Sequence, residues 1–128
     1  LSTEERSSSI TSLDTPQQEI DDFCYDEVNI APSFSGGITK MVEWLYQNSE
    51  LPNLVSDIPR YNEFTVQVVV KKDGTISNPQ LIYSLNPKAG AEIIRVMPLM
   101  PKWKPGKVNG IGDVKCRYRF KIKLSNDI

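Results

Sequence analysis

The most regular pattern in the chain is an alternation of apolar and basic residues near its C-terminus. Apolar side chains occupy every second position from Val114 to Leu124, and each residue between them is Lys or Arg. A period of two is typical of a β-strand with one face on the core and one in water. We therefore predict a strand whose outer face carries Lys115, Arg117, Arg119, Lys121 and Lys123.

A second alternating segment, Phe64 to Lys71, predicts another strand, and its β-branched residues suit the centre of a sheet. Residues 72–75 read Lys-Asp-Gly-Thr, a turn that is typical of hairpins, so Ile76 to Ser84 is predicted to be the return strand. Pro79 has no N–H to donate, so we expect this return strand to lie at the sheet edge or to carry a bulge.

Two further segments have the period of an amphipathic helix. In the segment from about Ile38 to Asn48 the apolar face consists of Ile38, Met41, Val42 and Leu45. The other begins at Asn86, a cap residue followed by proline, and ends at Pro98. These elements predict a small α+β domain, in which a three-stranded antiparallel sheet of order 2-1-3 has its helices packed on one face.

The length of 128 residues fits one domain, although charge divides the chain unevenly. Residues 1–22 carry six acidic side chains and one basic, with few apolar residues, so we expect a flexible acidic tail before a domain over residues 23–128. The net charge of −1 provides no field that would attract nucleic acid, and the cationic strand has no exposed aromatic residues for base stacking. We expect no nucleic-acid partner.

Composition removes several catalytic chemistries. The chain has no His, which excludes Ser-His-Asp catalysis and His-containing zinc sites, and two Cys cannot form a four-thiolate site. The carboxylates are scattered along the sequence, so we predict no catalytic residues, no metal, no cofactor and no enzymatic activity. No run of about 18 apolar residues is present. Because the chain begins at Leu1, we expect it to be a fragment of a longer product.

Three motifs in order carry a family resemblance. They are Pro-Ser-Phe-Ser-Gly-Gly at 32–37, Val-Val-Val-Lys-Lys-Asp-Gly-Thr-Ile-Ser at 68–77, and the segment 100–110 with Pro-Lys-Trp-Lys-Pro-Gly-Lys and then Asn-Gly. Over roughly residues 25–124 the chain resembles the TonB C-terminal domain of Bacteroidetes-type bacteria. Leu51 and Pro52 stand where the family has a Tyr-Pro pair, and residues 59–62 lack the glycines of its Gly-Ile-x-Gly motif.

The resemblance implies a periplasmic domain, tethered to the inner membrane in the full-length protein. Such a domain binds the TonB box of an outer-membrane receptor and couples nutrient uptake to an inner-membrane proton-channel complex, which the missing N-terminal part would contact. The alternative is a non-transducing peptide-binding or regulatory module, such as the C-terminal domain of a sensor-type membrane metallopeptidase.

Peptide binding of this kind needs an edge strand, because an extended peptide can add to its unpaired backbone groups. We place the contact on the strand edge from Lys115 to Lys123, and the resemblance adds Leu51 and Pro52. The cations of that strand could instead, or in addition, keep the edge from aggregating. Dimerisation through the exposed edge also stays open. Phe34 and Trp103 are expected to pack against the core rather than to contact a ligand.

The two cysteines are a candidate disulfide. Cys116 points to the core by the parity of its strand, and Cys24 lies in a short segment, Phe23 to Val28, that could run along the sheet. A bridge between them would persist in an oxidising compartment. A free, buried Cys116 that packs as a small apolar residue is the alternative.

Overall fold

The computed structural model describes residues 23–55 and 61–125, so the predicted acidic tail lies outside the described residues. The elements, in chain order, are β2 (Cys24–Tyr25), α3 (Gly37–Asn48), α4 (Leu51–Val55), β3 (Tyr61–Val70), β4 (Ile76–Ser84), α5 (Pro87–Val96), the short 3-10 helix η2 (Met97–Leu99), β5 (Gly106–Val108) and β6 (Gly112–Ser125). None of the helices in these ranges has the length and apolar character needed to span a membrane.

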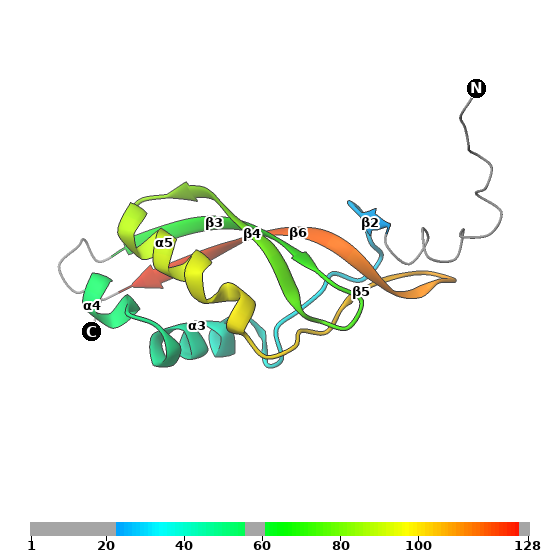
Figure 1. Cartoon of the computed structure of the whole chain (residues 1–128), viewed down its shortest axis with the longest axis horizontal. Coiled ribbons are helices and arrows are strands. Elements are labelled where there is room, and N and C mark those ends of the chain that lie inside the picture. Colours follow the sequence, from blue (N-terminus) through cyan, green and yellow to red (C-terminus); the bar gives the residue numbers. More distant parts are fainter. Residues whose placement is uncertain (1–22, 56–60, 126–128) are drawn as a thin grey trace, which may run out of the picture.

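The strands form one mixed, five-stranded sheet with the order β2-β6-β3-β4, and β5 pairs with β6 (Figure 1). The α+β class is confirmed. The predicted three-stranded antiparallel sheet is not, because β2 and β5 also pair with β6, β2 in parallel and β5 antiparallel. Strands of two and three residues are too short for alternation to reveal them.

Strands β3 and β6 form the regular centre of the sheet. Their antiparallel register runs without a break from Tyr61 opposite Ser125 to Val70 opposite Cys116. The apolar residues of both strands share one face, where Phe64, Val66, Val68, Val70, Ile122 and Leu124 are buried. Each such side chain contributes about 1.5–3 kcal/mol by leaving water. The cations of β6 alternate with these residues and lie on the other face, as predicted.

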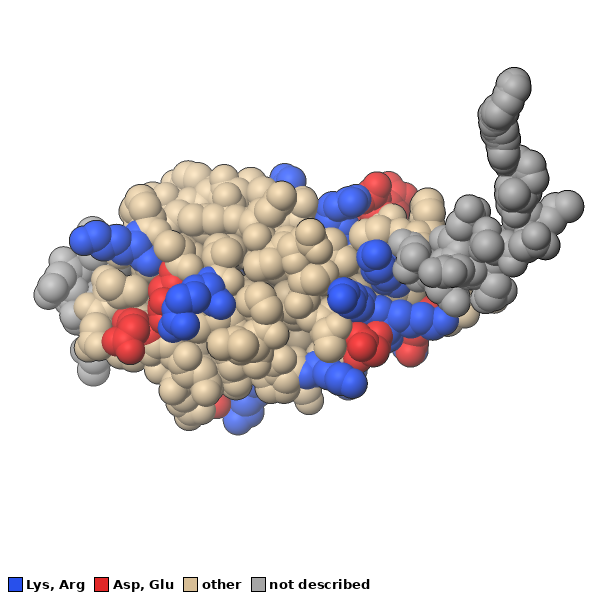
Figure 2. Space-filling model, viewed as in Figure 1, with Lys and Arg blue, Asp and Glu red and all other residues tan. Residues whose placement is uncertain are grey.

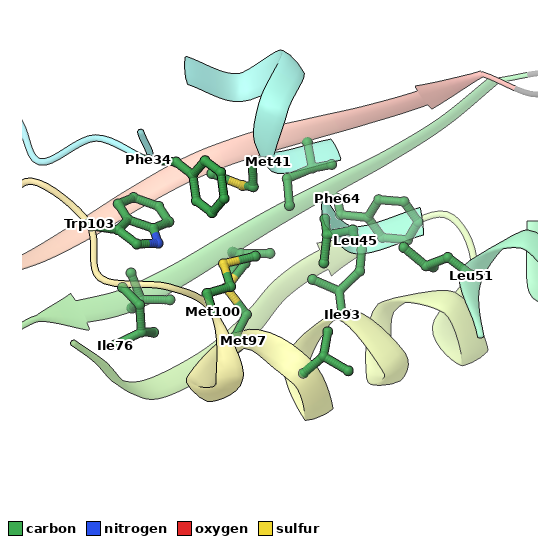
Figure 3. Close-up of a cluster of buried hydrophobic side chains, with 14 of the residues drawn as sticks. Phe34, Met41, Leu45, Leu51, Phe64, Ile76, Ile93, Met97, Met100 and Trp103 are labelled. Carbon is green, nitrogen blue, oxygen red and sulfur yellow. The ribbon is translucent and has the colours of Figure 1, made fainter. Parts of the chain in front are cut away.

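The helices cover the apolar face (Figures 1 and 3). Met41 and Leu45 of α3, Leu51 of α4 and Ile93 of α5 are buried in one cluster with the strand residues. The predicted cap of α5 is confirmed: Asn86 Oδ1 accepts hydrogen bonds from the backbone N–H groups of Lys88 at 3.1 Å and Ala89 at 3.2 Å. The side chain thereby satisfies two of the donors that a helix start leaves unpaired.

Strand β4 is the irregular outer strand of the sheet. Its pairing with β3 shifts twice, once between Thr65 and Val66 and once between Gln67 and Val69 of β3. The second shift falls at Asn78 and Pro79 of β4, where Asn78 has a φ of 51°. The prediction from Pro79 is therefore confirmed in both respects, since β4 is an edge strand and is bulged there.

Candidate peptide-binding groove

Strand β6 has an open edge along most of its length. On one side it pairs with β3 from Cys116 to Ser125, whereas β2 pairs only with Lys115 and Cys116. Within the described ranges, no strand pairs with the second side of residues 117–125. Every second residue of a strand directs its N–H and C=O to the same side, so this edge presents a row of unpaired donors and acceptors.

A groove follows this edge on the side of α3. It consists of two adjoining cavities of about 310 Å³ and about 450 Å³, which share Ile38 and Lys121. The larger one is lined by α3 and by Lys121 and Lys123 of β6. Since α3 covers one face of the sheet and these lysines extend from the other, a cavity that touches both lies at the open edge.

Aromatic side chains form the floor of the smaller cavity. Tyr118 and Phe120 of β6 stack with their ring centroids 5.4 Å apart, and Trp103 lies 5.6 Å from Phe120 and 6.1 Å from Phe34. Figure 3 shows Phe34 between Trp103 and Met41. Trp103 is only 3% exposed, so it packs in the core as predicted and also supports the groove. Tyr118 and Phe120 are half-buried, which leaves apolar surface at the edge.

The wall of the groove comes from α3. Its sequence pattern placed Ile38, Met41, Val42 and Leu45 on one buried stripe, but only Met41 and Leu45 are buried. Ile38 is 48% exposed and Val42 is half-buried, and both line the larger cavity. The stripe is wider than the contact between α3 and the core requires. The sequence alone does not show this excess, because all four residues have the same helical spacing.

The five predicted cations lie along the outer face of β6, on the rim of the open edge. Arg117 donates to the carboxylate of Asp26, and Lys121 Nζ lies 3.7 Å from Glu63 Oε2. Arg119 donates from Nη2 to the neutral amide oxygen of Gln67 at 3.0 Å, so this contact leaves its charge uncompensated. Lys123 also lines the larger cavity. The cationic row and the apolar groove thus flank the same edge from opposite faces of the sheet.

Leu51 and Pro52, the pair suggested by the family resemblance, do not join this site. Leu51 is fully buried in the core at the start of α4, where a partner cannot reach it. Pro52 is exposed, but it lines neither cavity of the groove. An apolar Leu in this position is used for packing.

Cys24 and Cys116 are both free thiols, so the candidate disulfide is not formed. The parallel register places Cys24 opposite Lys115, and Tyr25 opposite Cys116. Because neighbouring residues of a strand point to opposite faces, the two cysteines are directed apart. Burial raises the pKa of the Cys116 thiol and outweighs the hydrogen bond from the Gly106 backbone.

The most strongly perturbed carboxylate, Glu92 of α5, lies outside the groove. It accepts hydrogen bonds from Arg95 Nε at 2.8 Å, Arg95 Nη2 at 2.7 Å and the backbone N–H of Glu50 at 2.7 Å. Arg95 first, and then the Glu50 N–H, lower the pKa of Glu92 from 4.5 to about 2. All of its partners belong to the fold, so this carboxylate fastens the start of α4 to α5.

No protein-family model, no curated protein and no solved structure matches the chain. The geometry of the groove and the open edge is therefore the basis for assigning a function.

Proposed function

We propose that this domain binds an extended peptide as an additional strand on the open edge of β6. The observation that carries the proposal is the edge itself: residues 117–125 continue a regular strand with one side unpaired in the described structure, directly beside a groove. In strand addition the backbone supplies the hydrogen bonds, and pockets beside the edge select alternate side chains.

The expected affinity of such a site is modest. Each backbone hydrogen bond contributes about 0.5–1.5 kcal/mol net, and the peptide loses conformational freedom when it becomes a strand. A handful of such bonds gives a dissociation constant in the micromolar range or weaker. This affinity suits a contact that forms and breaks repeatedly.

The peptide that we propose is the TonB box of an outer-membrane receptor. The support is the resemblance of residues 25–124 to TonB C-terminal domains, together with the open edge on the strand where the alternating pattern led us to expect the contact. In this role the domain works in the periplasm, tethered to the inner membrane, and couples the receptor to energy from a proton-channel complex. A pull along the peptide loads the hydrogen bonds of the ladder together, which resists detachment better than loading them one at a time.

Backbone amide spectra of the labelled protein, titrated with a TonB-box peptide, test this proposal. We expect the largest shifts between Arg117 and Ser125 and around Ile38, with little change between Ile76 and Ser84. A peptide of the same sequence with proline at alternate positions is the control, because it cannot form the ladder. Shifts confined to Ile76–Ser84 would mean that the peptide binds along β4 and not along β6, which would overturn the proposal.

Transduction is separable from binding. A non-transducing peptide module, as at the end of a sensor-type metallopeptidase, would use the same groove with a different partner. Co-purification of the full-length protein from its own membranes distinguishes them: TonB-dependent receptors together with proton-channel subunits support transduction, and a preparation that captures neither contradicts it.

A further inference from the structure

The open edge of β6 has a different chemistry on each face of the sheet, and the difference restricts what can bind there. Resting on the proposed function, we infer that the bound peptide alternates two kinds of side chain: bulky apolar residues that face the groove, and Asp or Glu residues that face the cationic row. The peptide is thus recognised as an amphipathic strand with one acidic face.

The inward positions follow from the lining of the groove. A strand added beside β6 directs every second side chain toward the helices. There it meets the rings of Tyr118 and Phe120 on the floor and Ile38 and Val42 on the wall. Side chains that enter cavities of about 310 Å³ and 450 Å³ displace water from apolar surface. Over the rings of Tyr118 and Phe120 a polar side chain would lose hydration at apolar surface, whereas polar partners such as Thr39, Glu43 and Lys121 lie toward the larger cavity.

The outward positions follow from the charges on the rim. The remaining side chains of the added strand would stand opposite Arg117, Arg119, Lys121 and Lys123, at the short Cβ distances typical of cross-strand pairs. Asp26 accompanies Arg117, and Glu63, which lies opposite Lys123 in the register, has its carboxylate 3.7 Å from Lys121 Nζ. Arg119 donates to the neutral amide oxygen of Gln67, which leaves its charge uncompensated, and Lys123 lines the larger cavity. We therefore place the ligand carboxylates opposite Arg119 and Lys123.

One acidic residue of the domain also faces this part of the groove. Glu43 of α3 lines the larger cavity with Lys121 and Lys123, and its carboxylate lies 3.4 Å from Lys40 Nζ. Lys40 offsets the charge of Glu43, so the rim of the edge stays cationic. A row of cations repels other cationic strands, and the same charges favour an acidic peptide over a neutral one, so protection of the edge and selection of an acidic ligand are compatible.

Three synthetic peptides test the inference: a short strand in which Glu alternates with Val and Phe, the same strand with Gln for Glu, and the same strand with Lys for Glu. We expect the Glu peptide to bind most tightly and the Lys peptide most weakly. Exposed pairs of opposite charge make a difference of about two- to fivefold each in affinity. Raising the salt concentration from about 0.1 M to about 0.5 M should remove most of the preference for Glu over Gln.

Variants of the protein show which of its residues produce the preference for the Glu peptide. Arg119→Gln and Lys123→Gln should each weaken the Glu peptide about two- to fivefold and leave the Gln peptide unchanged. Lys88→Gln, an exposed lysine on α5, is the matched control. Ile38→Asp should weaken both peptides, and Ile111→Asp, at an exposed isoleucine on the turn before β6, should weaken neither.

The outcomes separate the two proposals. Equal binding of the Glu and Gln peptides, with amide shifts on Arg117–Ser125, overturns the acidic face and leaves strand addition intact. Tighter binding of the Lys peptide also overturns it. Absence of shifts on that edge with every peptide, including a TonB-box peptide, overturns strand addition as well.

Discussion

The two strands that flank β3, namely β4 and β6, differ in how they meet the helices. Strand β4 lies tightly against α5: a methyl group added at Gly90 would come within 2.6 Å of Leu81 Cδ2 and 3.0 Å of Ser84 Oγ. Strand β6 faces α3 across a groove of several hundred Å³. The helical layer therefore closes one side of the sheet and leaves the other open.

The two strands also differ in regularity and charge. The pairing of β4 with β3 shifts twice and includes a proline, whereas the pairing of β6 with β3 has no break. No residue from Ile76 to Pro87 is charged, while β6 carries a cation at every second position from Lys115 to Lys123. Figure 2 shows a largely uncharged surface over β4, with Lys and Arg gathered toward β5 and the start of β6. Bulges and proline block strand addition, and cations only restrict it to suitable partners.

The largest loss of stability is expected from a substitution in the turn before β4, where the backbone contacts Trp103 beneath the groove. Gly74, in the turn before β4, has a φ of +91° and accepts a hydrogen bond from the Trp103 backbone N–H at 2.8 Å. A Cβ at this position would lie 2.2 Å from the Trp103 carbonyl oxygen. We expect Gly74→Ala to lower the free energy of unfolding by about 2–4 kcal/mol, from backbone strain and from the clash together. Urea denaturation measures the loss.

Gly110→Ala is the matched control for this substitution. Gly110 also has a positive φ, of 82°, but nothing lies within 4 Å of its added Cβ. It should lose only about 1–2 kcal/mol, the cost of the strained backbone. Equal losses in the two variants would mean that the contact with Trp103 contributes nothing.

The next largest loss of stability is expected where Glu92 of α5 holds the start of α4. In Glu92→Gln the charged hydrogen bonds to Arg95 and to the Glu50 N–H are weakened, which should cost about 1–2 kcal/mol near neutral pH, since Arg95 is largely exposed. Because the fold lowers the pKa of Glu92 from 4.5 to about 2, its carboxylate stabilises the protein above pH 4.5. This contribution is lost as the pH falls toward 2.

The gap in stability between the wild type and Glu92→Gln should therefore close as the pH falls from 4.5 to 2. Denaturation curves at several pH values measure it. Glu43→Gln serves as the control, because its partner Lys40 is exposed and the pair should contribute little at any pH. A gap that persists unchanged at pH 2 would exclude the charge of Glu92 as its source.

A smaller effect is expected at the bulge of β4. Asn78 has a φ of 51°, which asparagine tolerates and a β-branched residue does not. Asn78→Val should cost about 1 kcal/mol, and Asn78→Gly should cost much less. Thermal unfolding of the two variants checks this order. If valine were tolerated as well as glycine, β4 could straighten, and the contrast between the two edges would disappear.

The regular parts of this fold could be predicted because their signals are local in the sequence. The alternation along β6, the Asn-Pro start of α5 and the proline of β4 each report a local requirement of the backbone. The groove could not be predicted in this way. Ile38 and Val42 have the same spacing as the buried residues of α3, and only the distance between α3 and β6 decides which of them are covered. Leu51 is the opposite case: we expected it to contact a partner, and it is fully buried in the core.

No change in stability is expected when a reductant is added, because the cysteines of β2 and β6 are not bridged. The register sets Cys24 opposite Lys115, so it and Cys116 point to different faces, and both are free. Reductant should leave the thermal midpoint unchanged, and the unfolded, unreduced protein should titrate two thiols per chain. A bridge across so long a loop would stabilise the protein by about 4–5 kcal/mol, so its reduction could not be missed. Loss of stability on reduction would mean that β2 sits one residue further along β6, because a shift of one residue exchanges the faces of a strand. Cys24 would then lie opposite Cys116, and the open edge would begin at a different residue.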